Sequence, residues 1–493
     1  MRAILLSLPL AALLLALPAA DNAAAFPPDA IDVQTDTVRP EDDLLFTSVR
    51  HLASQPPAGE QWRPEVFAMD LQTLQHHRLT FMDTQVMRHM AASPDRSKLA
   101  ITRILGDTNG STNIDELDDQ VIWIIDLPSG KAWPLTEDAT SAGAGGLDWL
   151  DDSTLVFNRR ALGDSQYDLA TANYLTGAVT LLTNTPTIIE TDVGASVDGD
   201  LLSYIATDTT DILGSDEFGP LFKSKVWVMN ADGSDPRQVT DGGALIGRAG
   251  PLSAGDYDPE LSPDNSKVVF GRAVALGAND IDPGDPIPPA GTHRVYTADV
   301  DTLQVAELTQ NDSVALIPDW DFDGTIYFAE IAITAEHAAD PYLGIATTSE
   351  AGGLTRLEPF PPQDIWKGAL VAKLLPSLDS DSDGALDPVD PCPADPDCDA
   401  DTFSDGVELH MGADPLLACP VDTLPDNEQP DPWPPDADDD RAAEIGDVIA
   451  LFRDIVLIPA AYQPRSDFTA DGSVNVGDVI AGYGGGKILS SCS

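Results

Sequence analysis

The sequence predicts a mainly β fold, a six-bladed β-propeller, followed by a small loop-rich module and a small α-helical module. Two observations predict the propeller: a turn-strand-strand-strand pattern recurs six times between residues 41 and 375, and the 493-residue chain is too long for one compact core. A third observation separates the C-terminal modules from the propeller: hydrophobic periodicity stops after Leu375, and Asp becomes the dominant residue.

The repeat is most complete between Pro259 and Gln310, with a Ser-Pro-Asp turn, apolar runs rich in β-forming residues, and a last run that ends in Leu-Thr. Similar units start at Ser93 and Ser196, and weaker ones near Asp43, Leu147 and Pro318. Six units of about 40 to 50 residues fit a propeller, whose ring leaves only short sheet edges. Six alike repeats fit the Greek-key connections of a β-sandwich poorly.

One stretch of the repeat carries a family resemblance. Residues 226–240 read VWVMNADGSDPRQVT and are followed by Ser262-Pro263-Asp264, a pattern that resembles the TolB-like propeller repeat. The resemblance covers residues 41–375 and implies a TolB-like six-bladed β-propeller. It does not identify a ligand, because relatives serve as binding platforms, as inhibitor scaffolds and as gates in front of peptidase domains.

Long insertions fall at one place in the repeat, between its second and third strands: Thr47–Pro64, Leu105–Gln120, Asp208–Lys223 and Val274–His293. In an up-and-down sheet these loops lie on the same face as the linkers between blades. Loops on a rigid scaffold often carry recognition residues, so this face is a candidate surface for a polysaccharide or protein ligand. Insertions also accumulate where nothing forbids them, and the sequence leaves both interpretations open.

The chain is strongly acidic, with 82 Asp and Glu against 26 Lys and Arg and a net charge of −56. Such a surface repels nucleic acid and attracts cations, which excludes nucleic-acid binding.

Residues 1–25 have the composition of an export signal: Arg2, an apolar run from Ile4 to Leu17, and small residues at Ala23 and Ala25. Residues 26–40 are interpreted as an N-terminal linker. No later run reaches the length of a membrane span, so we expect a secreted protein, extracellular or at the cell surface.

Two tandem loops of calcium type follow the propeller. Acids at positions 1, 3, 5 and 12 of a twelve-residue loop wrap one calcium ion with hard oxygen ligands, as in the EF-hand. Both loops also have an acid at position 9, and their predicted ligands are Asp379, Asp381, Asp383, Asp387 and Asp390, then Asp397, Asp399, Asp401, Asp405 and Glu408. A single charge run is usually a solvated linker, but two matched loops in tandem favour calcium.

Segment 376–418 resembles thrombospondin type 3 repeats, on these loops together with Cys392-Pro393 and Gly412-Ala413-Asp414-Pro415. The resemblance implies that calcium ions replace a hydrophobic core. A Pro-rich linker, expected to be extended and semi-rigid, follows at 419–435.

Region 436–493 contains a second pair of loops, each followed by a helical run. The predicted ligands are Asp436, Asp438, Asp440 and Asp447, then Asp467, Thr469, Asp471 and Asp478. Both loops run into Gly-Asp-Val-Ile-Ala, and this duplication resembles the type I dockerin. The resemblance implies a calcium-bound EF-hand-like module that binds a cohesin-type domain or a cell-surface partner.

Two departures from the dockerin pattern affect these expectations. Arg441 occupies position 6, where a left-handed backbone favours Gly, so the first of these sites should be the weaker one. Ile445-Gly446 and Val476-Gly477 replace the polar pair through which dockerins contact cohesin, which leaves the partner open.

The four cysteines, Cys392, Cys398, Cys419 and Cys492, all lie in this acidic part of the chain. An even number in an exported chain suggests disulfides, and three pairings are allowed.

No catalytic motif stands out: the sequence has neither G-x-S-x-G nor H-E-x-x-H, and a glycosidase carboxylate pair cannot be selected among 82 acids. His76-His77 is interpreted as a surface β position. Two hypotheses remain: a non-catalytic binding protein, which we favour, and a propeller-type polysaccharide hydrolase or lyase carried by the dockerin-like module.

Overall fold

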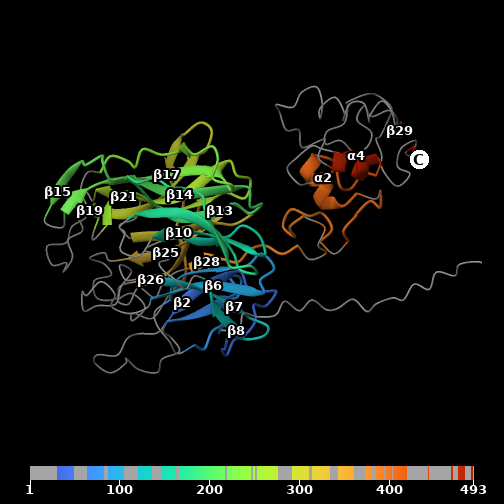
Figure 1. Ribbon diagram of the computed structural model, residues 1–493, viewed down its shortest axis with the longest axis horizontal. Helices are drawn as coiled ribbons and strands as arrows, with labels where there is room; N and C mark the ends of the chain where they lie inside the picture. Colours follow the sequence, from blue (N-terminus) through green and yellow to red (C-terminus); the bar gives the residue numbers. More distant parts are fainter. Residues whose placement is uncertain are drawn as a thin grey trace, which may run out of the picture.

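A computed structural model describes most propeller strands and part of the acidic region (Figure 1). The described residues are 30–48, 64–82, 87–104, 120–135, 146–160, 166–216, 219–245, 248–249, 252–275, 291–309, 314–332, 342–359, 372–379, 381, 383, 385–393, 395–401, 403–418, 442–443, 468–469, 476–483 and 490–491. Within these ranges the chain is mainly β, as predicted, and none of the helices is long and apolar enough to cross a membrane.

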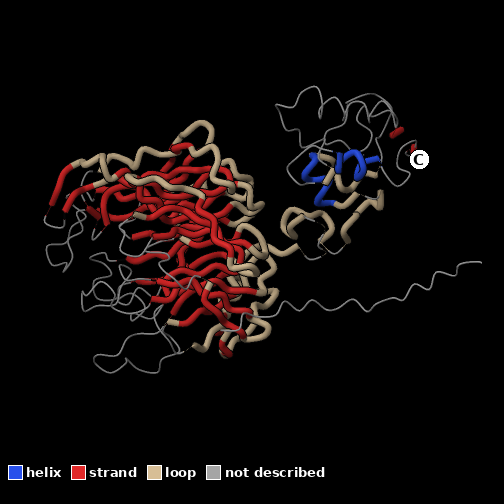
Figure 2. Tube along the Cα trace, viewed as in Figure 1, coloured by secondary structure: helices blue, strands red, loops and turns tan. Residues whose placement is uncertain are grey.

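Four separate sheets form blades of a propeller-like arrangement (Figure 2). In sheet order they are β28 (Ala372–Leu374), β2 (Leu44–Ser48), β3 (Glu65–Met69) and β4 (His76–Arg78); then β5 (Met87–Ala92), β6 (Lys98–Ile104), β7 (Gln120–Asp126), β8 (Lys131–Pro134) and β1 (Ile31–Asp32). The other two are β9 (Leu147–Trp149), β10 (Thr154–Arg160), β11 (Tyr167–Asn173) and β12 (Ala178–Leu181); and β24 (Val314–Trp320), β25 (Thr325–Ala332), β26 (Tyr342–Ser349) and β27 (Thr355–Pro359).

A fifth sheet has nine strands, where the repeat predicts two separate blades. Its path is β13 (Ile188–Ala195), β14 (Leu201–Asp208), β17 (Lys223–Asn230), β20 (Leu252–Leu261), β21 (Lys267–Ala275), β22 (Gly291–Asp299) and β23 (Val305–Glu307), with β18 (Arg237–Gln238) beside β17 and β19 (Arg248–Ala249) beside β20. Two antiparallel ladders are joined by a short parallel contact in which Ser224 pairs with Gly255. Gly255 allows this approach, because its φ is +131° and a Cβ there would lie 2.2 Å from Ser224 Oγ.

The two ends of the propeller region meet in one sheet. β28 is the innermost strand of the first blade and pairs antiparallel with β2, with Leu374 opposite Leu44. The amide of Leu375 also donates to the carbonyl oxygen of Asp43 at 2.8 Å. This pairing closes the ring with strands from opposite ends of the sequence and covers a sheet edge.

The second strands of the repeat supply the largest core side chains. Phe46, Phe157, Phe270 and Phe328 lie on β2, β10, β21 and β25, and each is at most 1% exposed. Each belongs to a different apolar cluster between sheets. Apolar burial between blades therefore stabilises the ring.

The innermost strands carry bulges with left-handed residues. The register of β13, β20 and β24 shifts at the positions of Asp192 (φ 51°), Asp258 (φ 48°) and Ile317 (φ 51°). This conformation is unfavourable for non-glycine residues, and the Ile317 amide is held by a hydrogen bond to Asp258 Oδ2 at 3.1 Å. Bulges re-aim side chains, and Glu260 and Asp319, which follow two of them, line a central cavity.

A small core also forms in the acidic region. Helix α2 (Asp405–Met411) begins after Ser404, whose Oγ accepts the Val407 amide, and ends at Gly412 (φ 76°). Helix α4 (Val476–Tyr483) lies beside it in Figure 1, and Phe403, Met411 and Phe468 form a shared buried cluster with Val407, Val479 and Ala481. A two-stranded pair, β29 (Ala442–Ala443) and β30 (Ser490–Ser491), is also described. The segments expected to be two modules, 376–418 and 436–493, thus share apolar contacts.

Candidate functional site

The first Asp loop, residues 379–390, brings its predicted ligands together. One carboxylate oxygen from each of Asp379, Asp381 and Asp383 lies within 4.8 Å of the others. The Asp383 amide donates to Asp379 Oδ1 at 3.1 Å, and the Ala385 amide donates to Asp383 Oδ1 at 2.7 Å. Burial and the charges of nearby carboxylates raise the pKa of Asp381.

The end of the first Asp loop returns to its beginning. The Asp387 amide donates to the carbonyl oxygen of Leu378 at 2.7 Å, which closes the loop backbone. Asp390 is 7% exposed, and its Oδ1 accepts the Cys392 amide at 2.7 Å. Its Oδ2 is buried without a hydrogen-bond partner in the described part of the chain. Positions 1, 3, 5 and 12 therefore present carboxylate oxygens in a compact loop.

The second Asp loop, residues 397–408, has a similar geometry. Carboxylate oxygens of Asp397, Asp399 and Asp401 lie within 4.8 Å of one another. The Asp401 amide donates to Asp397 Oδ1 at 3.1 Å and to Asp399 Oδ1 at 3.0 Å, so the backbone curls around these side chains. The Phe403 amide donates to Asp401 Oδ1 at 2.8 Å and leads the chain into the small core.

Glu408, at position 12 of the second Asp loop, has acceptors that no described protein group uses. Its side chain is 0% exposed, and both carboxylate oxygens are buried without a hydrogen-bond partner among the described residues. Burial, and then the charges of Asp401 and Asp399, raise the pKa of Glu408 to about 10. A buried carboxylate among other carboxylates is unfavourable unless a cation or a proton neutralises it. Calcium prefers such hard oxygen donors, so the donor set fits this ion.

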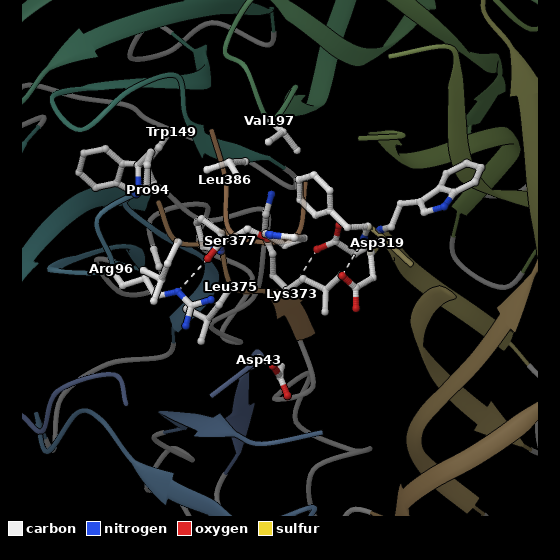
Figure 3. A pocket seen from close by; sticks show the side chains of 18 of the residues that line it. Asp43, Pro94, Arg96, Trp149, Val197, Asp319, Lys373, Leu375, Ser377 and Leu386 are labelled. Atoms are coloured by element: carbon white, nitrogen blue, oxygen red, sulfur yellow. Dashed lines mark hydrogen bonds between the residues drawn. The ribbon is translucent and has the colours of Figure 1, made fainter. Parts of the chain in front are cut away.

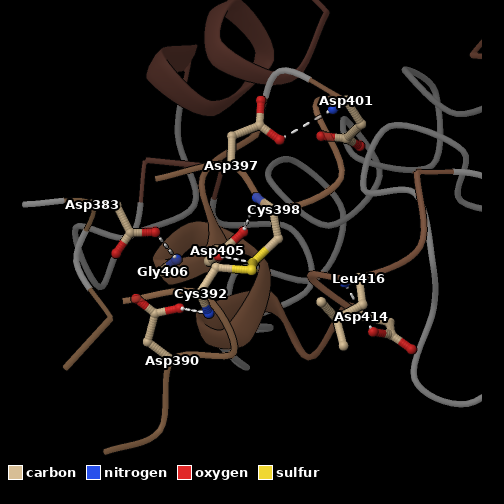
Figure 4. The surroundings of a disulfide bond; sticks show 10 residues. All are labelled: Asp383, Asp390, Cys392, Asp397, Cys398, Asp401, Asp405, Gly406, Asp414 and Leu416. Atoms are coloured by element: carbon tan, nitrogen blue, oxygen red, sulfur yellow. Dashed lines mark hydrogen bonds between the residues drawn. A yellow bond between two sulfur atoms is a disulfide. The ribbon is translucent and has the colours of Figure 1, made fainter. Parts of the chain in front are cut away.

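A disulfide joins Cys392, two residues after the first Asp loop, to Cys398 in the second Asp loop (Figure 4). It is one of the pairings that the sequence leaves open, while Cys419 and Cys492 lie outside the described residues. Asp383 of the first loop also accepts the Gly406 amide, at the start of α2, through Oδ2 at 2.8 Å. The two loops are therefore linked both covalently and by hydrogen bonds.

Asp405, predicted as the position 9 ligand, lies at the first residue of α2 and is 0% exposed. Its Oδ1 accepts the Cys398 amide at 2.9 Å, and burial raises its pKa to about 6. Asp405 therefore supports the backbone of the second Asp loop in addition to adding charge to it.

The second pair of predicted loops is described only in part. Asp436, Asp438, Asp440, Asp447, Asp467 and Asp471 lie outside the described residues. Thr469 and Asp478, at positions 3 and 12 of the last loop, are brought together: Thr469 Oγ1 and its amide donate to Asp478 Oδ1 at 2.9 and 3.1 Å. Asp478 is 0% exposed in the first turn of α4.

A charged ring lies at the centre of the propeller-like arrangement (Figure 3). Lys373 Nζ lies 2.8 Å from Asp148 Oδ2 and 3.0 Å from Glu260 Oε1, and Asp319 is a third acid close to the lysine. These residues come from the innermost strands β28, β9, β20 and β24. Burial raises the pKa of Glu260 to about 8 despite the opposing charge of Lys373, and it also raises the pKa of Asp319. Three carboxylates thus share one ammonium group in a largely buried site.

We call Lys373, Asp148, Glu260 and Asp319 the charged ring. The charged ring forms the floor of a central cavity of about 350 Å³. The walls include Trp149, Trp320, Phe322 and the turn residues Pro94 and Val197. Residues 376–378 and 386–388 also line the cavity. A smaller cavity of about 50 Å³, lined by residues that include His89, Asp192 and Asp258, also touches Lys373 and Glu260. Burial raises the pKa of Asp258 to about 6 and, together with the Asp258 charge, raises that of Asp192.

The central cavity is not on the face that the insertions indicate. It lies at the turns between first and second strands, opposite the loops between second and third strands. Of the four long insertions, only 208–223 is largely described, with the hairpin β15 (Gly214–Asp216) and β16 (Gly219–Leu221). Sequence reasoning missed the ring acids, although Asp148, Glu260 and Asp319 share one repeat position, immediately before the last residue of β9, β20 and β24.

No protein-family model matches the sequence, and no curated protein is similar to it in sequence. Solved structures show likeness of fold alone. TolB from Acinetobacter baumannii is 15% identical, with a TM-score of 0.40 over 68% of this chain and 67% of that chain. A chain of the nidogen/laminin complex is 11% identical, with a TM-score of 0.42 over 67% and 97% of the two chains. Oligogalacturonate lyase from Vibrio parahaemolyticus is 14% identical, with a TM-score of 0.37 over 67% and 86%. These neighbours include TolB-like β-propeller proteins, and the similarities carry no information about a ligand or an activity of this chain.

Proposed function

We propose that this chain is a secreted calcium-binding protein of several modules. In this proposal the propeller is a platform for a protein or carbohydrate ligand, and the C-terminal module mediates cohesin-type assembly or attachment to a cell surface. The single observation that carries the calcium part is the Glu408 carboxylate, buried beside Asp397, Asp399 and Asp401 without a described hydrogen-bond partner. A calcium ion would supply the positive charge and the coordination that this carboxylate lacks.

Two ions would occupy the Asp loops. Asp379, Asp381, Asp383 and Asp390 would hold the first, and Asp397, Asp399, Asp401 and Glu408 the second, with Asp387 and Asp405 adding negative charge. Bound calcium screens the repulsion between these carboxylates and fixes loops that have little apolar surface to bury. Thr469 and Asp478 would contribute to a further site in the dockerin-like module.

The platform role rests on the propeller-like arrangement and its central cavity. Counting the two antiparallel ladders of the nine-stranded sheet as one blade each gives six blades, which supports the predicted architecture. The cavity combines aromatic walls with charged groups at its floor, a lining suited to a ligand that has both apolar and polar parts.

The docking role rests on the duplicated Gly-Asp-Val-Ile-Ala sequence and on α4. Ile480 in this helix is 67% exposed although it is a large apolar residue, so it is available to a partner surface.

Calorimetric titration of the chelator-treated full chain with calcium chloride tests the calcium proposal. We expect saturable binding, and Glu408→Gln should reduce the number of ions bound. The matched control is Asp301→Asn, because Asp301 is an acid on the propeller surface that is 88% exposed. If both variants bind calcium as the parent chain does, Glu408 is not a ligand and the assignment is wrong.

Incubation of the full chain with a polysaccharide panel tests the platform proposal against catalysis. Retention without turnover supports a binding platform. New reducing ends or unsaturated products would contradict it and favour the hydrolase or lyase hypothesis.

A further inference from the structure

The first Asp loop lies against the opening of the central cavity. The chain leaves the propeller through β28 and reaches Asp379 only five residues after Leu374. Leu378, Leu386, Asp387 and Pro388 then line the cavity together with the charged ring. Figure 3 shows Leu386 among the lining residues of this cavity, together with Lys373 and Asp319. We call the residues 376–378 and 386–388 the roof.

Arg96 fastens the roof to the propeller. It lies in the turn between β5 and β6, with a φ of 53°, and its guanidinium donates to two backbone carbonyls. Nε donates to Pro376 O at 2.7 Å, and Nη1 donates to Asp42 O at 3.0 Å. Burial lowers the pKa of Arg96, and the charges of Asp43, Asp42 and Asp387 oppose this shift. One side chain therefore contacts the start of the propeller region and the roof, with Asp387 close enough to interact electrostatically.

A longer-range electrostatic interaction also connects the acidic region with the propeller. Burial and the charge of Asp198 raise the pKa of Asp200, and the charge of His410 in α2 opposes the rise. Asp200 belongs to the turn 196–200, which also contributes Val197 to the cavity wall. The charge of His410 therefore acts on a propeller turn that also lines the cavity.

The roof and the predicted calcium ligands belong to one closed loop. Asp387 is both a roof residue and the position 9 acid, and the hydrogen bond from its backbone amide to the carbonyl oxygen of Leu378 joins the two ends of the roof. Without a cation, the carboxylates of Asp379, Asp381 and Asp383 repel one another across less than 4.8 Å. A bound ion removes this repulsion and fixes the positions of residues 378 and 386–388.

We propose that calcium in the first Asp loop closes the central cavity: the loaded loop seats the roof on Arg96, and the ion-free loop withdraws it. This inference rests on the proposed calcium function and deepens it, because it makes access to the propeller's cavity depend on the ion. A ligand of the cavity would then bind in competition with the loaded roof or beneath it.

Hydroxyl-radical footprinting of the full chain, in calcium or in chelator, measures the exposure of the cavity walls, and calorimetry on the same samples counts the ions bound. We expect calcium to slow oxidation of Trp320 and Phe322 by about fivefold, a typical lower value for coupling between two sites. Arg96→Gln and Leu386→Ser should each retain the number of ions bound and lose most of this protection. Arg237→Gln is the control, because Arg237 is 43% exposed and lies in β18, away from the cavity lining.

Each outcome separates the two proposals. If calorimetry detects no calcium binding, the proposed function fails and this inference fails with it. If calcium binds but oxidation of Trp320 and Phe322 is unchanged in the parent chain, the roof is not coupled to the ion, while calcium binding stands. Full protection retained in both Arg96→Gln and Leu386→Ser would also overturn the coupling.

Discussion

The propeller and the acidic C-terminal region differ in the side chains that they bury. In the propeller the buried groups are aromatic and aliphatic, such as Phe157 and Phe270, and apolar burial stabilises by about 25 cal/mol per Å². In the Asp loops the fully buried groups include the carboxylates of Asp405 and Glu408. Removal from water thus stabilises the first region and destabilises the second, unless a cation compensates.

The largest expected effect is in the propeller core. Phe157→Ala should lower the free energy of unfolding of the propeller by about 3–5 kcal/mol, because it removes a fully buried ring and leaves a cavity between blades. Denaturant unfolding measures this loss, and calorimetry should find calcium binding unchanged. A loss of calcium binding in the folded variant would show that the two regions are not distinct.

The charged ring is the place where the propeller resembles the acidic region. Lys373→Met leaves Asp148, Glu260 and Asp319 without their shared cation and should destabilise the propeller by about 3 kcal/mol at pH 9. The loss should be smaller at pH 6, because burial raises the pKa of Glu260 to about 8 and a proton can then replace the cation. Lys131→Met is the control, since its partner Asp32 is 86% exposed. Equal losses at both pH values would contradict this account.

A single buried carboxylate, that of Glu190, also tests whether a buried charge destabilises the propeller. Burial raises its folded pKa to about 7 from 4.5, although the Thr183 hydroxyl donates to it. A raised carboxyl pKa stabilises the fold below the unfolded pKa, and this contribution is lost as pH rises through the folded pKa. Relative to the parent chain, the free energy of unfolding of Glu190→Gln should therefore increase by about 1–2 kcal/mol as the pH rises from 5 to 8.

Thermal unfolding at both pH values measures this difference. The control is Glu350→Gln, because Glu350 is an exposed acid of the propeller. Its stability relative to the parent chain should not change between pH 5 and pH 8. A pH-independent effect of Glu190→Gln would mean that its carboxyl is not kept neutral by burial.

The smallest expected effect concerns α2. Ser404→Ala removes the N-cap of this helix and should destabilise the acidic region by about 1 kcal/mol. Hydrogen exchange of α2 amides in calcium measures it, while exchange of β21 and β22 should not change. An equal change in those strands would again contradict the separation of the two regions.

The strands and turns of the propeller could be predicted because the repeat encodes them locally. The Ser-Pro-Asp turns form through Ser and Asp side chains, as in the hydrogen bond from Ser262 Oγ to Asp264 Oδ1 at 2.7 Å. The nine-stranded sheet could not be predicted, because it depends on the close approach of Gly255 to Ser224 between two repeats.

The clustering of the Asp-loop carboxylates was predictable for a similar reason, since the predicted ligands of each loop lie within twelve residues. The ring acids were not, because Asp148, Glu260 and Asp319 come together only when the strands close around Lys373. The roof likewise depends on Arg96 and Pro376, which are far apart in the sequence and meet only in the folded chain. The contact of Phe403 with Phe468, at 5.8 Å between ring centroids, joins segments that the Pro-rich linker was predicted to separate.

The most direct test of the central claim is hydrogen exchange of the full chain in calcium and in chelator. We predict that chelation accelerates exchange throughout residues 385–418 and in α4, while the propeller strands β10, β14 and β21 retain their protection. Unchanged exchange in the acidic region would show that its buried carboxylates do not need calcium, and would contradict the account.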